Sequence, residues 1–263
     1  MGRRQAAWDV LAGMHADVAL VQEAGSPATS HSLAEAHGVD VWETALLAGR
    51  GKWRTAAVRL SDRVDLRRRA TVTLEASTSL DDWVVSRTGS VTAADVLVDG
   101  VAAFTAVSVY AAWEKVAGRG YADGSAHRIL SDLSALLVER PAHRLIVAGD
   151  WNLLRGYGEN GSAYWKARYD TVFDRAEALG LRFVGPQHPH GRRADPWPEE
   201  LPADSLCVPT FHHSRQRPET ATRQLDFVFA SASIADGVTV RALNAPEEWG
   251  PSDHCRMLID VDP

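Results

Sequence analysis

The chain has 263 residues, of which 45% are hydrophobic, so it can form one domain over residues 1–263 with a sizeable core. Its formal net charge of −6 at neutral pH argues against a surface uniformly covered with phosphate-binding groups, so any nucleic-acid site must be a local patch. Cys207 and Cys255 lack metal-ligand spacing, so we expect neither a zinc site nor a disulfide framework. The sequence has no run of 18 apolar residues and no secretory leader, so we expect a cytoplasmic protein without membrane contact.

The first half of the chain is expected to contain a helix followed by strands. Apolar residues recur at helical spacing over residues 3–16, and residues 18–21 then form the apolar run of a buried strand. Further stretches with strand character are residues 42–47, 55–60, 70–74, 91–98 and 101–110. Arg67-Arg68-Arg69 is interpreted as a solvated strand edge. Asp99-Gly100 separates residues 91–98 from residues 101–110 and favours a tight turn, because glycine accepts a positive φ. These two strands are therefore expected to be antiparallel neighbours.

The second half is expected to alternate helices with strands. A helical stripe over residues 129–137 ends before Pro141, and residues 145–147 begin a central strand. A second helix is expected at residues 169–179, and residues 185–209 hold too many prolines for regular structure. The last three expected strands are residues 224–230, 238–243 and 255–261.

Polar residues stand beside three of these apolar runs. Gln22-Glu23 follows the first strand, Gly149-Asp150-Trp151-Asn152 follows the central strand, and Ser252-Asp253-His254 precedes the last strand. In α/β scaffolds, carboxylates and imidazoles at strand ends line the crevice where ligands bind, while the strand bodies stay buried. The pattern indicates a hydrolase.

These three blocks, together with Leu225-Asp226-Phe227, resemble the endonuclease/exonuclease/phosphatase superfamily. Its members are metal-dependent phosphoesterases built like deoxyribonuclease I and the exonuclease III type of abasic-site endonuclease. The resemblance extends from about residue 5 to residue 261. It implies an α/β (α+β) fold of four layers, in which a two-sheet β-sandwich is flanked by helices.

Two positions depart from the family pattern. Family members begin with a strand that supplies an asparagine to the metal site, and this chain is expected to lack that strand, either because its start is truncated or because the site works without it. Some relatives also have an asparagine three residues after the tyrosine that corresponds to Tyr110, where this chain has Trp113.

The resemblance assigns roles to the residues of the blocks. Glu23 and Asp253 correspond to metal-binding carboxylates, and carboxylates suit Mg²⁺ or Mn²⁺. Asp150 would orient or deprotonate the attacking water, and Asn152 would donate to phosphoryl oxygens. Since these two residues are two apart on a chain taken as extended, both side chains should point to one face.

A histidine and its partner complete the expected site. His254 would protonate or hydrogen-bond the phosphate, and Asp226 would hold its other ring nitrogen, because a histidine needs such a partner to set its tautomer and pKa. Tyr110 resembles a tyrosine that contacts the phosphate in some members. Trp113 and Trp151 are candidates for stacking on a base or sugar, and a place in the core or in anchoring a loop is the alternative for both. Arg223 is a candidate for phosphate contact, and an exposed surface charge is the alternative.

The leading hypothesis is therefore a Mg²⁺- or Mn²⁺-dependent phosphodiesterase that acts on nucleic acid as an endonuclease or exonuclease. A second hypothesis is a phosphatase or phosphodiesterase acting on a small-molecule or lipid phosphate, which the same residues would support and the acidic balance mildly favours. A third is a non-catalytic binding protein derived from this fold, although such a protein would have no need of an oriented imidazole.

Overall fold

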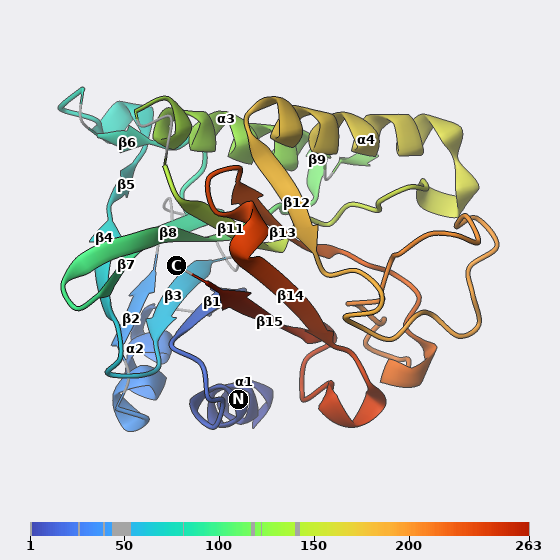
Figure 1. The fold of residues 1–263 in the computed structure, drawn as a ribbon, viewed down its shortest axis with the longest axis horizontal. Helices are drawn as coiled ribbons and strands as arrows, with labels where there is room; N and C mark the ends of the chain where they lie inside the picture. Colours follow the sequence, from blue (N-terminus) through green and yellow to red (C-terminus); the bar gives the residue numbers. More distant parts are fainter. Residues whose placement is uncertain are drawn as a thin grey trace.

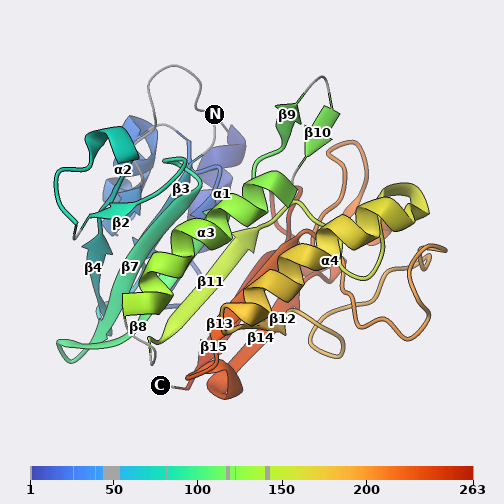
Figure 2. The ribbon, with the colours of Figure 1, turned by 90° about the horizontal axis from the view of Figure 1, so that it is seen from above.

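The computed structural model describes residues 2–25, 27–38, 40–43, 54–80, 82–116, 119–121, 123–139 and 143–262. Two β layers pack face to face, and helices cover the outer side of each (Figures 1 and 2). This arrangement is the expected four-layer α/β sandwich. Buried apolar side chains between the layers form its core.

The larger β layer is a six-stranded sheet with the order β12-β13-β11-β8-β7-β4. β8 and β11 run parallel at its centre, and the other neighbours in the sheet are antiparallel. All six residues of β11 are buried, as expected for a central strand covered on both faces. Its strands are β4 (Asp65–Arg69), β7 (Val91–Val98), β8 (Val101–Tyr110), β11 (Leu145–Asp150), β12 (Leu181–Gly185) and β13 (Asp226–Ser231).

Two long helices cover the outer face of this sheet, α3 (Asp123–Glu139) and α4 (Ala163–Ala178) (Figure 1). α3 buries Ile129, Leu130 and Leu133, whose spacing places them on one side of the helix. Ser162 caps α4 by accepting a hydrogen bond from the backbone N–H of Trp165. None of the helices among the described residues combines the length and the apolar character that crossing a membrane would require.

The second β layer consists of two separate groups of strands. One has the order β1-β3-β2, formed by β1 (Val18–Gln22), β2 (Asp40–Glu43) and β3 (Thr55–Arg59), and its outer face carries α1 (Gly2–Ala12) and α2 (Pro27–Ala36). The other is the antiparallel pair of β14 (Val238–Leu243) and β15 (Arg256–Val261). The first group packs on β7, β8 and β11, and β14 packs on β12.

Within the described residues, β1 pairs only with β3 and β15 pairs only with β14. Both strands nevertheless contribute to one apolar region, because Leu20 of β1 and Ile259 of β15 pack against the buried cluster that contains Ile146 and Val228. Among the residues that the structure describes, β1 and β15 therefore each keep one unpaired edge in the same layer (Figure 1). That the sandwich lacks one strand beside β1 stays a prediction.

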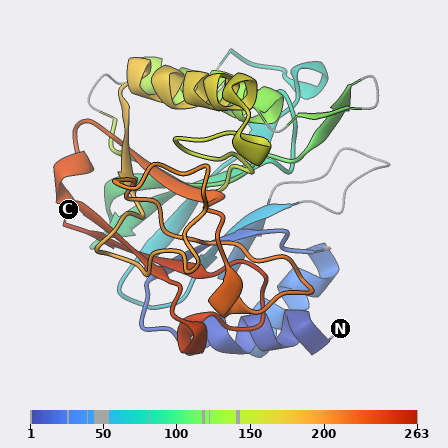
Figure 3. The ribbon, with the colours of Figure 1, turned by 90° about the vertical axis from the view of Figure 1, so that its right-hand side faces the viewer.

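Most of the long predicted elements are present. The strands predicted at residues 91–98, 101–110 and 238–243 have those bounds. Asp99 and Gly100 have φ values of 50° and 77°, as a tight hairpin turn requires, and β7 and β8 are antiparallel neighbours. Residues 186–209 contain no helix or strand, as predicted, and Figure 3 shows these loops, drawn in orange, at one end of the sandwich.

Other predictions were wrong or lie outside the described residues. The strand predicted at residues 70–74 is only β5 (Thr71–Val72), because residues 74–76 form a turn of 3-10 helix. The helices begin earlier than predicted, at Asp123 and Ala163. Residues 44–47 and Pro141 are outside the described residues. The interpretation of residues 67–69 as a solvated strand edge is confirmed, because β4 is a largely exposed edge strand of the large sheet. The elements not predicted are α2, β12 and the short strands β6 (Trp83–Val84), β9 (Glu114–Val116) and β10 (Arg119–Tyr121).

Candidate active site

The candidate site is built where β8, β11 and β13 meet at one edge of the six-stranded sheet. Asp150, the last residue of β11, lies opposite Tyr110, the last residue of β8, and opposite Asp226, the first residue of β13. Three polar residues that are far apart in the sequence thus share one row of the sheet. Hydrogen bonding in the sheet determines their spacing, so the row is a rigid base for chemistry.

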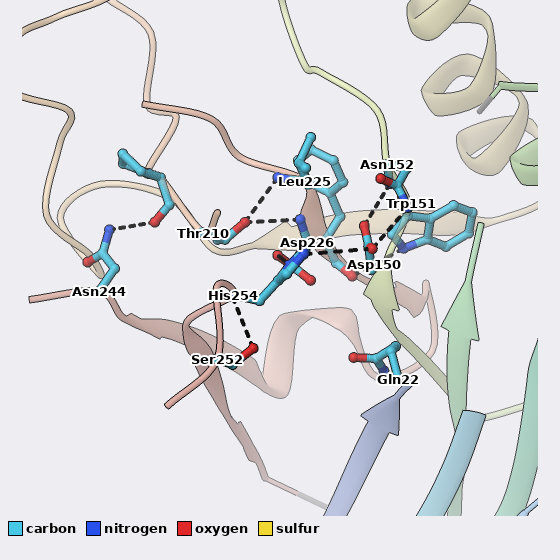
Figure 4. Close-up of polar contacts among 12 residues, drawn as sticks. Gln22, Asp150, Trp151, Asn152, Thr210, Leu225, Asp226, Asn244, Ser252 and His254 are labelled. Atoms are coloured by element: carbon cyan, nitrogen blue, oxygen red, sulfur yellow. Dashed lines mark hydrogen bonds and ion pairs between the residues drawn. The ribbon is translucent and has the colours of Figure 1, made fainter. Parts of the chain in front are cut away.

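His254 joins this row from the segment before β15. Its Nδ1 lies 2.8 Å from Asp226 Oδ2, and its Nε2 lies 4.0 Å from Asp150 Oδ2 (Figure 4). An ionised carboxylate only accepts hydrogen bonds, so Nδ1 carries the hydrogen and donates it to Asp226. The predicted pairing of His254 with Asp226 is therefore present in the structure, and it leaves Nε2 facing Asp150.

Residues that sequence analysis did not identify hold this pair in place. The backbone N–H groups of Leu225 and Asp226 donate to Thr210 Oγ1 at 3.0 and 3.1 Å (Figure 4). The ring of Phe211 lies 5.0 Å from the His254 ring and is tilted against it. A buried threonine and an aromatic residue in a loop carry no distinctive sequence signal, so only the fold could identify them.

Opposing electrostatic effects act on His254 and Asp150. Burial by itself lowers the pKa of His254, but the charge and hydrogen bond of Asp226, with the charges of Asp150 and Asp253, raise it to about 10. Burial raises the pKa of Asp150, and the charges of Asp226 and Glu23 raise it further, while His254 and the Asn152 backbone N–H lower it. His254 is therefore protonated at neutral pH, and Asp150 is held close to a positive charge.

Glu23 approaches the same row from the end of β1. Tyr110 donates its hydroxyl to Glu23 Oε1 at 3.0 Å, and the Glu23 side chain is exposed. Glu23 has a φ of 53°, an uncommon value for a non-glycine residue and one that is often found at functional sites. Burial, followed by the charges of Glu23 and Asp150, raises the pKa of Tyr110, so its hydroxyl stays protonated and serves as a donor.

Gln22 ties the end of β1 to the larger sheet. Its Nε2 donates to Ser108 Oγ at 2.9 Å, and Ser108 Oγ donates to the carbonyl of Val21 at 3.0 Å. The Gln22 amide fits there because Gly149 has no side chain. A Cβ at Gly149 would lie 2.0 Å from the Val109 carbonyl oxygen and 2.9 Å from Gln22 Nε2. Gly149 thus permits the close approach that brings Glu23 to the site.

Gly149→Ala is expected to lower the free energy of unfolding by about 2–5 kcal/mol, because it combines a positive φ with a steric clash. Gly156→Ala is the matched control. Gly156 also has a positive φ, but nothing lies within 4 Å of a Cβ built there, so about 1–2 kcal/mol should be lost. Denaturant unfolding of both variants measures the two values, and equal losses would contradict the close packing around Gly149.

Asn152 does not continue the extended chain that the sequence indicated. β11 ends at Asp150, and Asn152 has a φ of 52°, so the prediction that the two side chains share a face through strand geometry is wrong. A turn brings them together instead. The Asn152 backbone N–H donates to Asp150 Oδ1 at 2.9 Å, and Asn152 Nδ2 donates to Asp150 Oδ2 at 2.9 Å and to the Ala111 carbonyl at 3.2 Å.

The other predicted site residues lie in different surroundings. Trp151 is only 1% exposed and donates its Nε1–H to the Phe227 carbonyl, so the prediction that it stacks on substrate is wrong: its ring is part of the core. Arg223 is paired with Glu159. Asp253 is exposed beside His254. Trp113 is 49% exposed and donates its Nε1–H to Asn152 Oδ1.

The donor set at this edge could hold a cation. Ligand atoms of Asp150, Asp226 and His254 lie within 4.8 Å of one another, and the two carboxylates are the available donors while His254 is protonated. Glu23 is close enough for its charge to raise the pKa of Asp150. Carboxylate oxygens dominate the set, and oxygen donors suit hard divalent cations.

Several solved structures resemble this chain over its full length. The AP endonuclease LMAP from Leishmania major is 16% identical with a TM-score of 0.64, and the match covers 100% of this chain and 83% of that one. The endonuclease domain of TRAS1, a telomere-specific non-LTR retrotransposon, is 18% identical with a TM-score of 0.61 and coverage of 100% and 94%. The 3′ phosphatase NExo from Neisseria, bound to a product DNA hairpin, is 16% identical with a TM-score of 0.61 and coverage of 99% and 95%.

No protein-family model and no curated protein sequence matches the chain. The structural matches show its fold, which is the one that the four sequence blocks indicated.

Proposed function

We propose that this chain, which has the fold of the endonuclease/exonuclease/phosphatase superfamily, is a divalent-metal-dependent phosphodiesterase that cleaves nucleic acid. One observation carries the proposal. Asp226 holds His254 Nδ1 at 2.8 Å, and His254 Nε2 then lies 4.0 Å from Asp150. Glu23 is joined to the same row of the sheet through Tyr110. An oriented imidazole, a buried carboxylate and a nearby exposed carboxylate are the groups that hydrolysis of a phosphodiester needs.

The residues fit a cation such as Mg²⁺ or Mn²⁺. Asp226 and Glu23 both raise the pKa of the Asp150 carboxyl, so negative charge is concentrated at the site. Glu23 and Asp253, both exposed, would be the protein ligands, and Mg²⁺ usually needs only one or two. When bound, the cation would neutralise charge on phosphoryl oxygens and favour attack by water.

The protein side chains would divide the remaining work. Asp150, ionised, would orient the attacking water and accept its proton. His254, protonated, would donate Nε2–H to a phosphoryl oxygen, while Asp226 keeps the imidazole in place. Tyr110 would hold Glu23 and contact the phosphate. Both hydrogens of the Asn152 amide already have acceptors, so donation to phosphate would require one of these bonds to be exchanged.

Nucleic acid is the substrate we favour. Two of the structural neighbours are an AP endonuclease and a retrotransposon endonuclease domain, and a third was solved with a DNA hairpin. The half-exposed ring of Trp113 beside Asn152 offers a surface on which a base or sugar would stack. A small-molecule or lipid phosphate is the alternative substrate, and a non-catalytic binding protein is the alternative role.

Residues 1–263 would form one catalytic domain, because the site combines residues from the end of β1 to the segment before β15. Arg223 is a further candidate for phosphate contact once its pairing with Glu159 is exchanged. The cytoplasmic location stays a prediction.

Activity is expected to require added Mg²⁺ or Mn²⁺ and to disappear in EDTA. Glu23→Gln should raise the metal concentration for half-maximal activity by about 10–100-fold, a range seen when metal sites lose supporting contacts. Plasmid DNA, an abasic duplex, RNA and bis(nitrophenyl) phosphate would be assayed with each metal. Glu35→Gln, at an exposed position on α2, is the control and should behave as wild type. Full activity in EDTA would reject the metal requirement.

A further inference from the structure

Trp113 lies three residues after β8 and combines exposure with a specific internal hydrogen bond. Its side chain is 49% exposed, yet its Nε1–H donates to Oδ1 of the buried Asn152 at 2.9 Å. An exposed indole can donate to water without loss. The indole therefore does not need this bond, whereas the buried Asn152 amide beside Asp150 is held in position by it.

That bond acts together with two acceptors on the other side of the Asn152 amide to determine which way the amide faces. The indole N–H can only donate, so the amide atom facing it must be Oδ1. Nδ2 then faces the Ala111 carbonyl at 3.2 Å and Asp150 Oδ2 at 2.9 Å. A carbonyl can only accept a hydrogen bond, and so can the Asp150 carboxylate when it is ionised. In the opposite orientation two donors would face each other at Trp113, and Oδ1 would face two acceptors. Every polar atom in this network is satisfied in one orientation alone.

The orientation of Asn152 in turn holds Asp150. Oδ1 of Asp150 accepts the Asn152 backbone N–H, and Oδ2 accepts the Asn152 amide. Both oxygens of the carboxylate are thus tied to one residue, and Oδ2 is also the atom that lies 4.0 Å from His254 Nε2. An amide free to rotate would release Oδ2 and allow the carboxylate to turn away from His254.

We infer that Trp113 is a positioning residue, whose indole N–H locks the Asn152 amide and through it the Asp150 carboxylate. This inference rests on the proposed function, in which Asp150 orients the attacking water. It gives Trp113 a role that differs from base stacking, since stacking uses the ring face and positioning uses only the N–H. The two roles can be separated by changing one and keeping the other.

The first experiment removes the N–H and keeps the aromatic ring. Trp113→Phe, and replacement of Trp113 by benzothienylalanine, in which sulfur replaces the indole N–H, would be assayed on bis(nitrophenyl) phosphate, which has no nucleobase. kcat is expected to fall by about 10–100-fold with KM within about twofold, as when a catalytic group is misplaced. Trp197→Phe is the control, because it removes an indole bond to the Leu201 carbonyl away from the site. Unchanged kcat in the benzothienylalanine protein would overturn the inference.

The second experiment detects the hydrogen bond between Trp113 and Asn152 without an activity assay. In ¹H–¹⁵N spectra of the wild type, the Trp113 indole N–H should exchange slowly with solvent, and Asn152→Ala should make it exchange as fast as an exposed indole. Trp113→Phe should shift or broaden the Asn152 side-chain NH₂ resonances. Fast exchange in the wild type would overturn the inference. If the wild type hydrolyses no phosphodiester, the proposed function fails, and these spectra still decide whether Trp113 orients Asn152.

Discussion

His254→Gln is expected to lower kcat by about 10²–10⁴-fold, the range associated with loss of a positioned proton donor. Glutamine keeps a polar group of similar size but cannot carry the positive charge that the raised pKa of about 10 gives His254 at neutral pH. Steady-state kinetics on bis(nitrophenyl) phosphate would measure the loss. His190→Gln, at an exposed histidine in the long loop, is the control and should leave kcat unchanged.

The hydrogen bond between His254 and Asp226 leads to a second prediction. Asp226→Asn should also lower kcat, and the double variant should be little worse than His254→Gln alone, because both residues act through one imidazole. Removing the Asp226 charge should lower the His254 pKa from about 10, since that charge helps to raise it. NMR titration of the imidazole in metal-free buffer would show this shift. Additive kinetic losses, or an unchanged His254 pKa, would refute the partnership.

Asp150→Asn is expected to cost at least about 10³-fold in kcat, because an amide cannot accept the proton of the attacking water. The remaining carbonyl oxygen can still accept the Asn152 backbone N–H, but the new NH₂ group would face the Asn152 side-chain NH₂ group, so thermal unfolding would be measured beside kcat. In the wild type, activity should rise with pH as Asp150 ionises, and burial places this rise above the usual carboxylate range. A bound cation favours the ionised form and would move the rise to lower pH.

The same experiment tests the assignment of the base. In Asp150→Asn the residual activity should lose that acidic limb of the pH profile. Asp174→Asn, at an exposed position on α4, is the control and should retain both rate and profile. A variant at Asp150 that keeps the acidic limb would show that another group accepts the proton.

Local sequence patterns determined the long elements of this fold. β7, β8 and β14 were predictable because each has a continuous or alternating apolar run, and Asp99-Gly100 has the chemistry of a hairpin turn. β4 was indicated only as a solvated strand edge at residues 67–69, because its sequence, DLRRR, is charged rather than apolar. Its pairing with β7 and the contacts of Arg67 and Arg69 with buried Asp95 stabilise it, and these are tertiary interactions.

The sequence by itself also determined which chemical groups stand at strand ends, including Glu23, Asp150 and His254. Only the tertiary structure decided how they meet. The register of β11 between β8 and β13 places Asp150 beside Tyr110 and Asp226. The same packing directs the Trp151 ring into the core. Residue type and spacing describe contacts within one element, whereas these contacts join residues on different strands and depend on which strands lie side by side.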